Sequence, residues 1–509
     1  MQKEIRLENI TKRFPGVLAD DHVNMIISAG TVHAVVGENG AGKSTLMNIL
    51  SGLYQPDDGR ILVDGEQVRF ENPRQAMRRG IGMVHQEFML VRNLTVLDNI
   101  ILGFEPSRAG MISRSVARRV LKDLMNAYKL DVPLDETVER LPVSMQQRVE
   151  IVKALYRGAD VLILDEPTSV LTPQESRVLF AAIRELVSRG KTVIFISHKL
   201  GEVLEVADRI SVMRDGRVVG ELPASDATER TLARLMVGRD VLMNFTPPGK
   251  PQGDPVLEVK EMTVKDARGL EVVKQVSFTV HAGEVLGIAG VAGNGQSELV
   301  KAIVGLVPTC SGSIHISRRD VTKASVKHRR QAGMRYIPQD RAWVGTCRQS
   351  ALWKNLLMGY EHYRKFSRFG LLRLDVVRRF ASDLVARFGI KTASLYVPAG
   401  TLSGGNLQKA IVARELALGP RLLIAEDPTR GIDIGATEFV RRQVLQVAEG
   451  GGAVLLVSQD LQEVMALSNR ILVMHKGQIV GERMPAETTE EELGLLMAGR
   501  ATRGTHDGR

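Results

Sequence analysis

The order of apolar and polar residues along the chain predicts two similar α/β domains. Residues 4–10 (EIRLENI) and 256–262 (VLEVKEM) alternate apolar and polar side chains, as half-buried strands do. Later in the chain come short apolar runs, such as VLILD at 161–165 and TVIFIS at 192–197, separated by stretches with helical periodicity. Short unbroken apolar runs are typical of parallel strands buried on both faces. The pattern therefore indicates an α/β fold with a mostly parallel sheet.

Two glycine-rich stretches indicate that the chain contains an internal repeat. Residues 37–46 (GENGAGKSTL) resemble residues 290–299 (GVAGNGQSEL), at an offset of 253 residues (290 − 37). At the same offset, Gln86 in GMVHQE corresponds to Gln339 in MRYIPQD. Similarity at one fixed spacing is the mark of a duplicated unit.

The repeat continues further along at a slightly larger offset. LPVSMQQRVEIVKAL, from Leu141, resembles LSGGNLQKAIVAREL, from Leu402, at an offset of 261 residues (402 − 141). The second copy thus has eight additional residues (261 − 253) between Gln339 and Leu402. The same offset relates His198 to Gln459.

A segment rich in proline and glycine separates the two copies. Residues 245–255 (FTPPGKPQGDP) cannot continue a helix or a central strand, because proline lacks the N–H that both require. We predict a linker there, with one domain at residues 1–244, a second at 256–500 and a C-terminal tail at 501–509.

Composition narrows the classes of protein that fit. No apolar run approaches the roughly 18 residues of a membrane span, and the N-terminal stretch does not resemble a signal peptide, so we expect a chain that neither spans a membrane nor is secreted. Cys310 and Cys347 lack the spacing of a zinc site, and we expect no disulfide. The net charge of +10 would suit an anionic partner. Because the basic residues are spread along the chain, we expect no direct binding of nucleic acid.

The first glycine-rich stretch matches the phosphate-binding motif GxxxxGK[ST] in the required context, between an apolar run, VHAVV, and a helical run, TLMNIL. Backbone N–H groups of such a loop and the start of the helix surround the phosphates of ATP. We expect Lys43 to reach the β and γ phosphates and Ser44 to ligate Mg²⁺. The predicted ATP-binding loop consists of Gly37, Glu38, Asn39, Gly40, Ala41, Gly42, Lys43, Ser44 and Thr45.

Polar side chains at the ends of two predicted strands supply the remaining chemistry. Asp165 and Glu166 end an apolar strand, where Asp165 can hold Mg²⁺ and Glu166 can polarise the attacking water. His198 follows the next apolar strand and is predicted to contact the γ-phosphate. The alternative interpretation, a strand-end carboxylate pair that caps a helix and a structural histidine, is less favoured with the loop upstream.

Loop, glutamine, acidic strand and strand-end histidine occur in this order twice, and this arrangement resembles the ATP-binding-cassette family over nearly the whole chain. The resemblance implies two tandem P-loop domains, each with a mostly parallel sheet core, an antiparallel β subdomain and a helical subdomain. It also implies that Phe14 stacks on adenine, and that Gln86 takes part in catalysis and in the Mg²⁺ site and couples it to a membrane partner. The segment before each acidic strand is then a signature, usually LSGGQ, which closes over the ATP of the opposite cassette in a head-to-tail dimer.

The second copy departs from the first at three catalytic positions. Gln296 replaces the loop lysine and provides no charge to offset the phosphates. The acidic pair is reversed to Glu426 and Asp427, which shortens the side chain at the position of the base, and Gln459 replaces the histidine. A displacement of about 1 Å can lower a rate roughly a hundredfold. These changes argue against efficient hydrolysis in the second copy.

The signatures show the opposite asymmetry. The second copy keeps LSGGN at 402–406, whereas the first reads LPVSM at 141–145, in which Pro142 removes a backbone donor. In a head-to-tail dimer the intact loop of the first copy faces the intact signature of the second. We therefore predict one hydrolytic site in the chain, completed by Ser403, Gly404, Gly405 and Asn406.

The lysine-free loop GVAGNGQSE resembles that of motor proteins of bacterial importers for simple sugars and nucleosides, and the segments 82–103 and 358–372 are most similar to the nucleoside branch. This resemblance implies two integral-membrane permease subunits, an extracytoplasmic or lipid-anchored solute-binding protein, and a peripheral location on the cytoplasmic face of the plasma membrane. The alternative is a soluble twin-cassette ATPase that acts on ribosomes or nucleic acid. That class predicts a long charged linker and two consensus sites.

Overall fold

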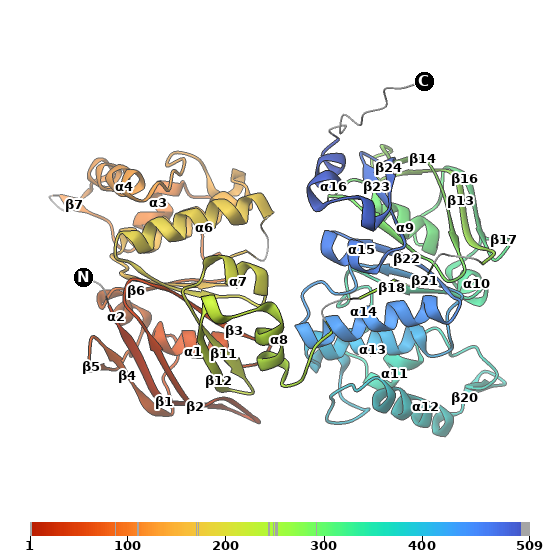
Figure 1. Cartoon of the computed structure of the whole chain (residues 1–509), viewed down its shortest axis with the longest axis horizontal. Helices are drawn as coiled ribbons and strands as arrows, with labels where there is room; N and C mark the ends of the chain where they lie inside the picture. Colours follow the sequence, from red (N-terminus) through yellow and green to blue (C-terminus); the bar gives the residue numbers. More distant parts are fainter. Residues whose placement is uncertain are drawn as a thin grey trace. The chain divides into compact units, whose positions relative to one another are not determined.

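The computed structural model describes residues 3–86, 88–108, 111–168, 171, 173–242, 245–247, 249, 253–291 and 293–499. The chain divides into two compact units, Met1–Val241 and Leu242–Arg509, coloured red to yellow-green and green to blue in Figure 1. The predicted linker lies partly outside the described residues and stays a prediction, and the predicted tail, 501–509, lies wholly outside them.

The core of the first unit is a six-stranded sheet with the order β12-β11-β3-β10-β9-β6. All neighbours are parallel except the edge pair β11 and β12. The two apolar runs predicted to be strands are β9 and β10, and every residue in them is buried. The strands are β3 (Val32–Gly37), β6 (Ile81–Val84), β9 (Val161–Asp165), β10 (Thr192–Ile196), β11 (Arg209–Arg214) and β12 (Arg217–Pro223).

A second, antiparallel sheet of the first unit has the order β2-β1-β4-β5. The predicted alternation appears in β1, where Ile5, Leu7 and Ile10 are buried in one cluster with side chains of α1 and of the six-stranded sheet. Helix α1 is therefore held between the two sheets, which fixes the loop at its start. The strands are β1 (Ile5–Phe14), β2 (Val17–Ile27), β4 (Asp58–Val63) and β5 (Glu66–Val68), with a small hairpin of β7 (Ser107–Arg108) and β8 (Met111–Ile112).

Helices α3, α4 and α5 pack against one another and form the helical subdomain of this unit. The helices are α1 (Lys43–Leu50), α2 (Pro73–Arg78), α3 (Val96–Ile101), α4 (Arg114–Tyr128), α5 (Val143–Tyr156), α6 (Pro173–Ser188), α7 (Leu200–Val206) and α8 (Glu229–Val237), with 3-10 turns at Val138–Arg140 and Ala224–Asp226.

The second unit repeats this architecture. Its main sheet has the order β18-β21-β22-β15-β23-β24, and its antiparallel sheet the order β14-β13-β16-β17. The strands are β13 (Pro255–Lys265), β14 (Glu271–His281), β15 (Val285–Ala289), β16 (Ser311–Ile316), β17 (Arg319–Asp320), β18 (Met334–Ile337), β19 (Ser367–Arg368), β20 (Leu371–Leu372), β21 (Leu422–Glu426), β22 (Ala453–Ser458), β23 (Arg470–His475) and β24 (Gln478–Arg483).

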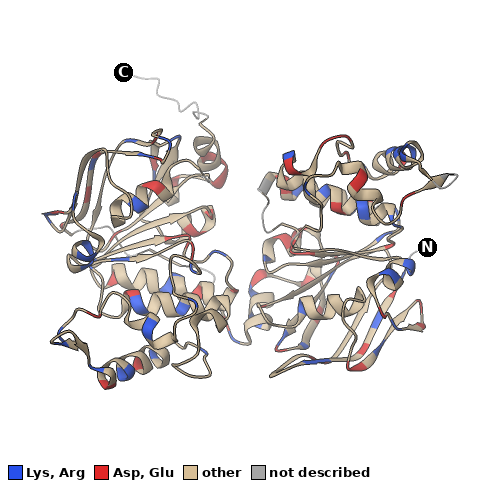
Figure 2. Cartoon of the chain, turned by 180° about the vertical axis from the view of Figure 1, so that it is seen from behind, with Lys and Arg blue, Asp and Glu red and all other residues tan. Residues whose placement is uncertain are grey.

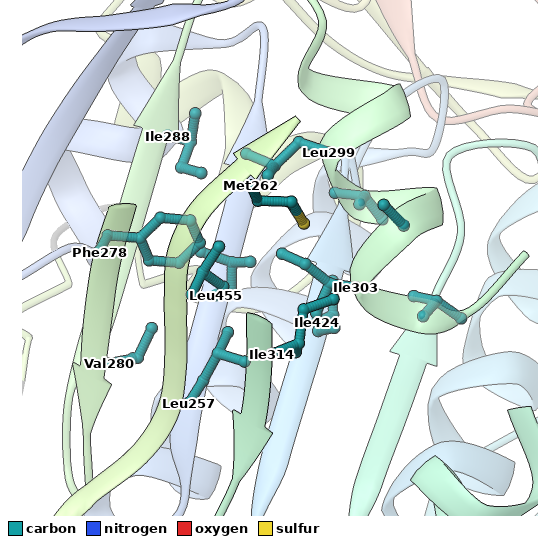
Figure 3. Packing of buried hydrophobic residues seen from close by; sticks show 14 of the residues in the cluster. Leu257, Met262, Phe278, Val280, Ile288, Leu299, Ile303, Ile314, Ile424 and Leu455 are labelled. Atoms are coloured by element: carbon teal, nitrogen blue, oxygen red, sulfur yellow. The ribbon is translucent and has the colours of Figure 1, made fainter. Parts of the chain in front are cut away.

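Apolar side chains from both sheets of the second unit meet around α9. Figure 3 shows Leu257 and Phe278 of the antiparallel sheet in one cluster with Ile303 of α9 and Ile424 of the main sheet. The helices are α9 (Gln296–Val304), α10 (Val326–Gln331), α11 (Leu352–Leu357), α12 (Leu374–Arg387), α13 (Gly404–Leu416), α14 (Ile434–Glu449), α15 (Leu461–Leu467) and α16 (Glu490–Met497), with 3-10 turns at Ala399–Thr401 and Pro485–Glu487.

The predicted fold class is confirmed, since each unit has a mostly parallel sheet, an antiparallel sheet and a group of helices. Within the described ranges, no helix is long and apolar enough to cross a membrane. Cys310 and Cys347 are free and exposed. On the face that Figure 2 shows, basic side chains are interspersed with acidic ones over both units, as their spread along the sequence suggested.

Candidate active site

The predicted phosphate loop connects β3 to α1, and residues 37–45 run from the end of the strand into the first turn of the helix. Gly40 and Gly42 have φ of +86° and +100°, which side chains rarely adopt. A Cβ atom on Gly42 would lie 2.4 Å from Oδ1 of Asp20, whereas one on Gly40 would meet nothing within 4 Å. The loop is thus packed on one side and open on the other, where N–H groups at the start of α1 can bind an anion.

Lys43 lies over this loop. Its ammonium group donates to the carbonyl oxygens of Gly37, at 2.8 Å, and Glu38, at 3.0 Å. The side chain is largely buried, so its charge is held at the loop where the predicted phosphates bind.

The acidic pair stands at the end of β9, where the chain turns sharply. Glu166 has φ of +46°, and its backbone N–H donates to the carbonyl of Ile196 in the neighbouring strand β10 at 3.0 Å. A non-glycine residue in this region costs about 1–3 kcal/mol, so the surrounding hydrogen bonds must hold it there. The turn lets two consecutive carboxylates serve the same site.

Asp165 is buried beside the start of α1. Burial raises the pKa of its carboxyl group, as does the charge of Glu166, while a hydrogen bond from Ser44 and the charge of Lys43 oppose this shift. The hydroxyl of Ser44 and the carboxylate of Asp165 are therefore neighbours, and oxygen ligands of this kind are what Mg²⁺ prefers. These residues fit the predicted metal ion.

Glu166 receives hydrogen bonds on both carboxylate oxygens. Oε1 lies 3.0 Å from Nδ1 of His198, and Oε2 accepts from the side-chain amide of Gln86 at 3.2 Å. The hydrogen bond from His198 is the main cause that lowers the pKa of Glu166. The three side chains follow β9, β10 and β6, which are parallel neighbours, so their carboxyl ends meet at one edge of the sheet. The structure thus brings together the three residues predicted to act in catalysis.

Phe14 ends β1 and keeps 36% of its surface exposed. Its ring packs edge-on against Tyr54, at 5.6 Å between centroids, with the ammonium of Lys12 5.7 Å from the ring. An exposed aromatic ring suits a nucleobase. Its stacking on adenine stays a prediction.

Asp20 on β2 is a residue that the sequence reasoning missed. It is fully buried against Gly42, and neither carboxylate oxygen has a hydrogen-bond partner among the described residues. Burial raises the pKa of this carboxyl group to about 7. The offset of the repeat assigns Val273 to the same position of the second copy, and that contrast was a signal available from the sequence.

The second copy preserves the shape of the loop without its charge. Gly293 and Gly295 have φ of +86° and +99°, close to their counterparts in the first copy. The amide of Gln296, which replaces the lysine, donates to the carbonyl of Val291 at 3.3 Å. These two glycines keep the backbone conformation of their counterparts, but a neutral group occupies the lysine position.

The reversed acidic pair of the second copy is held by hydrogen bonds from its own unit. Glu426 accepts from the hydroxyl of Ser297 at 2.6 Å and from that of Tyr336 at 2.5 Å. Asp427 accepts from the amide of Gln339 at 2.6 Å and from the backbone N–H of Gln459 at 2.8 Å. Where Glu166 receives an imidazole, Asp427 receives a backbone group.

The two predicted signatures also differ in structure. In the second unit Ser403 caps α13 by accepting from the backbone N–H of Asn406, and the amide of Asn406 donates back to Ser403 at 2.9 Å. Gly404 and Gly405 form the first turn, where a Cβ on Gly405 would lie 2.8 Å from Asp433. In the first unit α5 begins after Pro142, and no side chain among the described residues caps its first turn. A capped helix start with glycine N–H groups suits phosphate.

Comparison with known proteins supports the assignment of both units. Residues 21–169 and 273–430 match the ABC transporter family. The chain is 45% identical over 499 residues to the guanosine import ATP-binding protein NupO of Bacillus subtilis, which covers 98% of each chain. It is 42% identical over 525 residues to the glucose import ATP-binding protein TsgD13 of Haloferax volcanii, which covers 97% of this chain and 96% of the relative.

A solved structure resembles the chain at the level of the fold. The archaeal ribosome recycling factor aABCE1, in complex with the ribosomal stalk protein aP1, matches with a TM-score of 0.62 over 96% of this chain and 92% of that structure. At 20% sequence identity this likeness shows the fold alone. The family match and the full-length relatives show that this chain belongs to the ATP-binding proteins of the ABC transporter family.

Proposed function

We propose that the protein is the ATP-hydrolysing subunit of a bacterial ABC importer for nucleosides or simple sugars. The observation that carries the proposal is similarity over nearly the full length to a guanosine and to a glucose import ATP-binding protein. The higher identity to the guanosine protein and the sequence of segments 82–103 and 358–372 favour nucleosides.

In this proposal ATP binds at the loop of the first cassette. Backbone N–H groups of residues 37–45 and the ammonium of Lys43 neutralise the phosphates, and Phe14 packs on adenine. Ser44, Asp165 and Gln86 hold Mg²⁺, which when bound neutralises charge on the β and γ phosphates. The proximity of Ser44 to Asp165 supports this ligand set.

Glu166 then orients and polarises the water that attacks the γ-phosphate. Its lowered pKa keeps the carboxylate charged and able to accept a hydrogen bond from that water. His198 and Gln86 fix the carboxylate from two sides, and His198 also lies at the strand edge where the γ-phosphate binds. Positioning of this kind, with electrostatic stabilisation, accounts for most of the catalysis of phosphoryl transfer.

We further propose that Ser403, Gly404, Gly405 and Asn406 of the second cassette complete this site in a head-to-tail arrangement. The capped start of α13 and the uncapped start of α5 support the choice of the second signature over the first. The second loop, with Gln296 and a reversed acidic pair, does not hydrolyse ATP efficiently. One composite site in each chain then drives transport.

The proposed partners are two integral-membrane permease subunits and an extracytoplasmic or lipid-anchored solute-binding protein. The chain would attach to the permeases on the cytoplasmic face of the plasma membrane, without direct contact to nucleic acid. The alternative, a soluble factor that acts on ribosomes, has only a likeness of fold in its favour, whereas the importers match in sequence over the full length.

The proposal is tested by ATPase activity in liposomes that contain the chain with the membrane proteins that co-purify with it. Nucleosides or ribose are added with a solute-binding protein, and Lys43→Ala serves as the inactive control. We expect the matching solute to stimulate phosphate release, and Lys43→Ala to abolish the stimulation. Activity that ignores the permeases and rises with ribosomes would support the soluble factor instead.

A further inference from the structure

The two cassettes differ in the environment of the carboxylate that faces the phosphate loop. Asp165 ends β9 and Glu426 ends β21, and both are buried and bonded to the serine that follows the loop lysine or its replacement. What differs is the second neighbour of the carboxylate.

That neighbour comes from the adjacent strand at an equivalent position. Met83 on β6 pairs with Ile163, and Tyr336 on β18 pairs with Ile424, so the two side chains occupy the same place in the two sheets. The hydroxyl of Tyr336 donates to Oε2 of Glu426 at 2.5 Å. A methionine at this position has no hydroxyl and cannot donate such a hydrogen bond to Asp165.

The hydroxyl of Tyr336 remains a hydrogen-bond donor. Burial, followed by the charge of Glu426, raises the pKa of the Tyr336 phenol above its usual range, so the group keeps its proton. With Ser297 on Oε1 and Tyr336 on Oε2, each oxygen of Glu426 accepts an O–H hydrogen bond of 2.6 Å or less. Mg²⁺ demands near-ideal octahedral geometry at about 2.0–2.1 Å, and a carboxylate bonded in this way is a poor ligand for it.

The second carboxylate of the acidic pair, Asp427, also has a hydrogen-bond partner on each oxygen. Asp427 accepts from Gln339 on one oxygen and from the backbone of Gln459 on the other. Hydrogen bonds from these groups satisfy both buried carboxylates without a cation.

Glu166 of the first cassette is also bonded on both oxygens, so the difference between the cassettes lies at the other carboxylate. There Tyr336 donates to Glu426, whereas Met83 has no hydroxyl to donate to Asp165. At that position the residues of the second cassette do not fit the metal ion that the family implies.

We infer that the chain binds one divalent ion, in the first cassette, and that Tyr336 and Glu426 close the corresponding position of the second cassette to metal. Any nucleotide bound at the second loop is then bound without Mg²⁺. This inference rests on the proposed function, which supplies the metal site of the first cassette.

The inference is tested by counting bound Mn²⁺ by electron paramagnetic resonance on the full chain, saturated with a non-hydrolysable ATP analogue. We expect one ion for each chain. Asp165→Asn should lower the count to zero, and Glu426→Gln should leave it at one. A count of two, with one ion lost in Glu426→Gln, would overturn the inference and leave the proposed function intact. A count of zero would contradict both.

Exchange of residues between the copies tests the role assigned to the tyrosine. The double variant Tyr336→Met, Glu426→Asp introduces the residues of the first cassette at these two positions and should raise the count to two. Met83→Tyr should remove the ion of the first cassette, while Met83→Phe, which adds a similar ring without the hydroxyl, should keep it. A double variant that binds nucleotide at both loops and still counts one ion would show that these two side chains do not exclude the metal.

Discussion

Nδ1 of His198 lies 3.0 Å from Oε1 of Glu166, at the carboxyl ends of two paired parallel strands, β10 and β9. The hydrogen bond lowers the pKa of Glu166 and fixes the direction of its carboxylate. At the same place in the second unit, Asp427 accepts from the backbone N–H of Gln459. This edge of the sheet is thus built around an imidazole in the first unit and around a peptide group in the second.

Glu166→Gln should abolish ATP turnover and leave ATP bound. A glutamine keeps the size of the side chain but cannot accept a proton, and a general base contributes about 10²–10⁴-fold. The measurement is phosphate release by the reconstituted transporter, with retained ATP determined by filter binding. Asp427→Asn is the matched variant in the second unit and should lower the rate far less. Equal losses in both variants would contradict the asymmetric assignment.

His198→Gln, which introduces the residue of the second copy, should lower kcat by roughly a hundredfold with a smaller change in KM. The amide cannot reproduce the aromatic N–H geometry that holds Glu166, and a misplacement of about 1 Å has an effect of this order. Steady-state kinetics at saturating ATP provide the measurement. Gln459→His is the reciprocal control and should not raise the rate, because the second site also lacks its lysine. A His198→Gln enzyme with unchanged kcat would remove His198 from the mechanism.

Much of the fold could be predicted from the sequence because short stretches of residues determine its strands. The runs VLILD and TVIFIS are buried strands, since no polar residue interrupts them, and the alternation of EIRLENI matches the burial of β1. The phosphate motif predicted the strand, loop and helix around Lys43 for the same reason, because each residue type in the motif is required by the conformation of the loop itself.

Other parts of the site were beyond the sequence because they depend on contacts between distant strands. Tyr336 and Glu426 are 90 positions apart, and only the register of β18 against β21 brings the phenol to the carboxylate. Asp20 was overlooked since an aspartate usually faces solvent, whereas here it is buried against Gly42. Its burial follows from the packing of β2 on the loop, a contact between segments that belong to different sheets.

Asp20→Asn should change the pH dependence of stability. The pKa of Asp20 is raised from 3.8 to about 7 in the folded chain, so the folded state keeps a proton that the unfolded state releases above pH 4. Stability from this group therefore falls as the pH rises from about 4 to about 7, by at most about 4 kcal/mol. Asparagine is neutral throughout.

Thermal unfolding between pH 5 and pH 8.5 provides the measurement for this prediction. The melting temperature of Asp20→Asn, relative to the unaltered chain, should increase from pH 5 to about pH 7 and then level off. Asp215→Asn, at an exposed position, is the control for the substitution of an aspartate by asparagine. Parallel curves for Asp20→Asn and the unaltered chain would mean that this carboxyl group titrates normally.

Arg341 connects three segments of the second unit. Its guanidinium donates to the carbonyls of Arg430, at 2.6 Å, and Gly431, at 2.8 Å, which follow the acidic strand. The same group lies beside the signature, 3.2 Å from where a Cβ atom on Gly404 would be. Arg341 thus fixes the start of α13 against the loop that follows β21.

Arg341→Ala should lower kcat by about tenfold. Without the guanidinium, the carbonyls after β21 are no longer bonded to the residue that lies beside the start of α13, and Ser403 to Asn406 are held less firmly. A loosened positioning group lowers the rate and not the binding alone. Arg341→Lys should be intermediate, since a lysine cannot reproduce the forked pair of hydrogen bonds. The measurement is kcat and KM of the reconstituted transporter, with the melting temperature recorded in parallel. Arg348→Ala, an exposed arginine of the same segment that contacts Trp343, is the control. Full activity in Arg341→Ala, or equal losses in both alanine variants, would show that Arg341 does not position the signature.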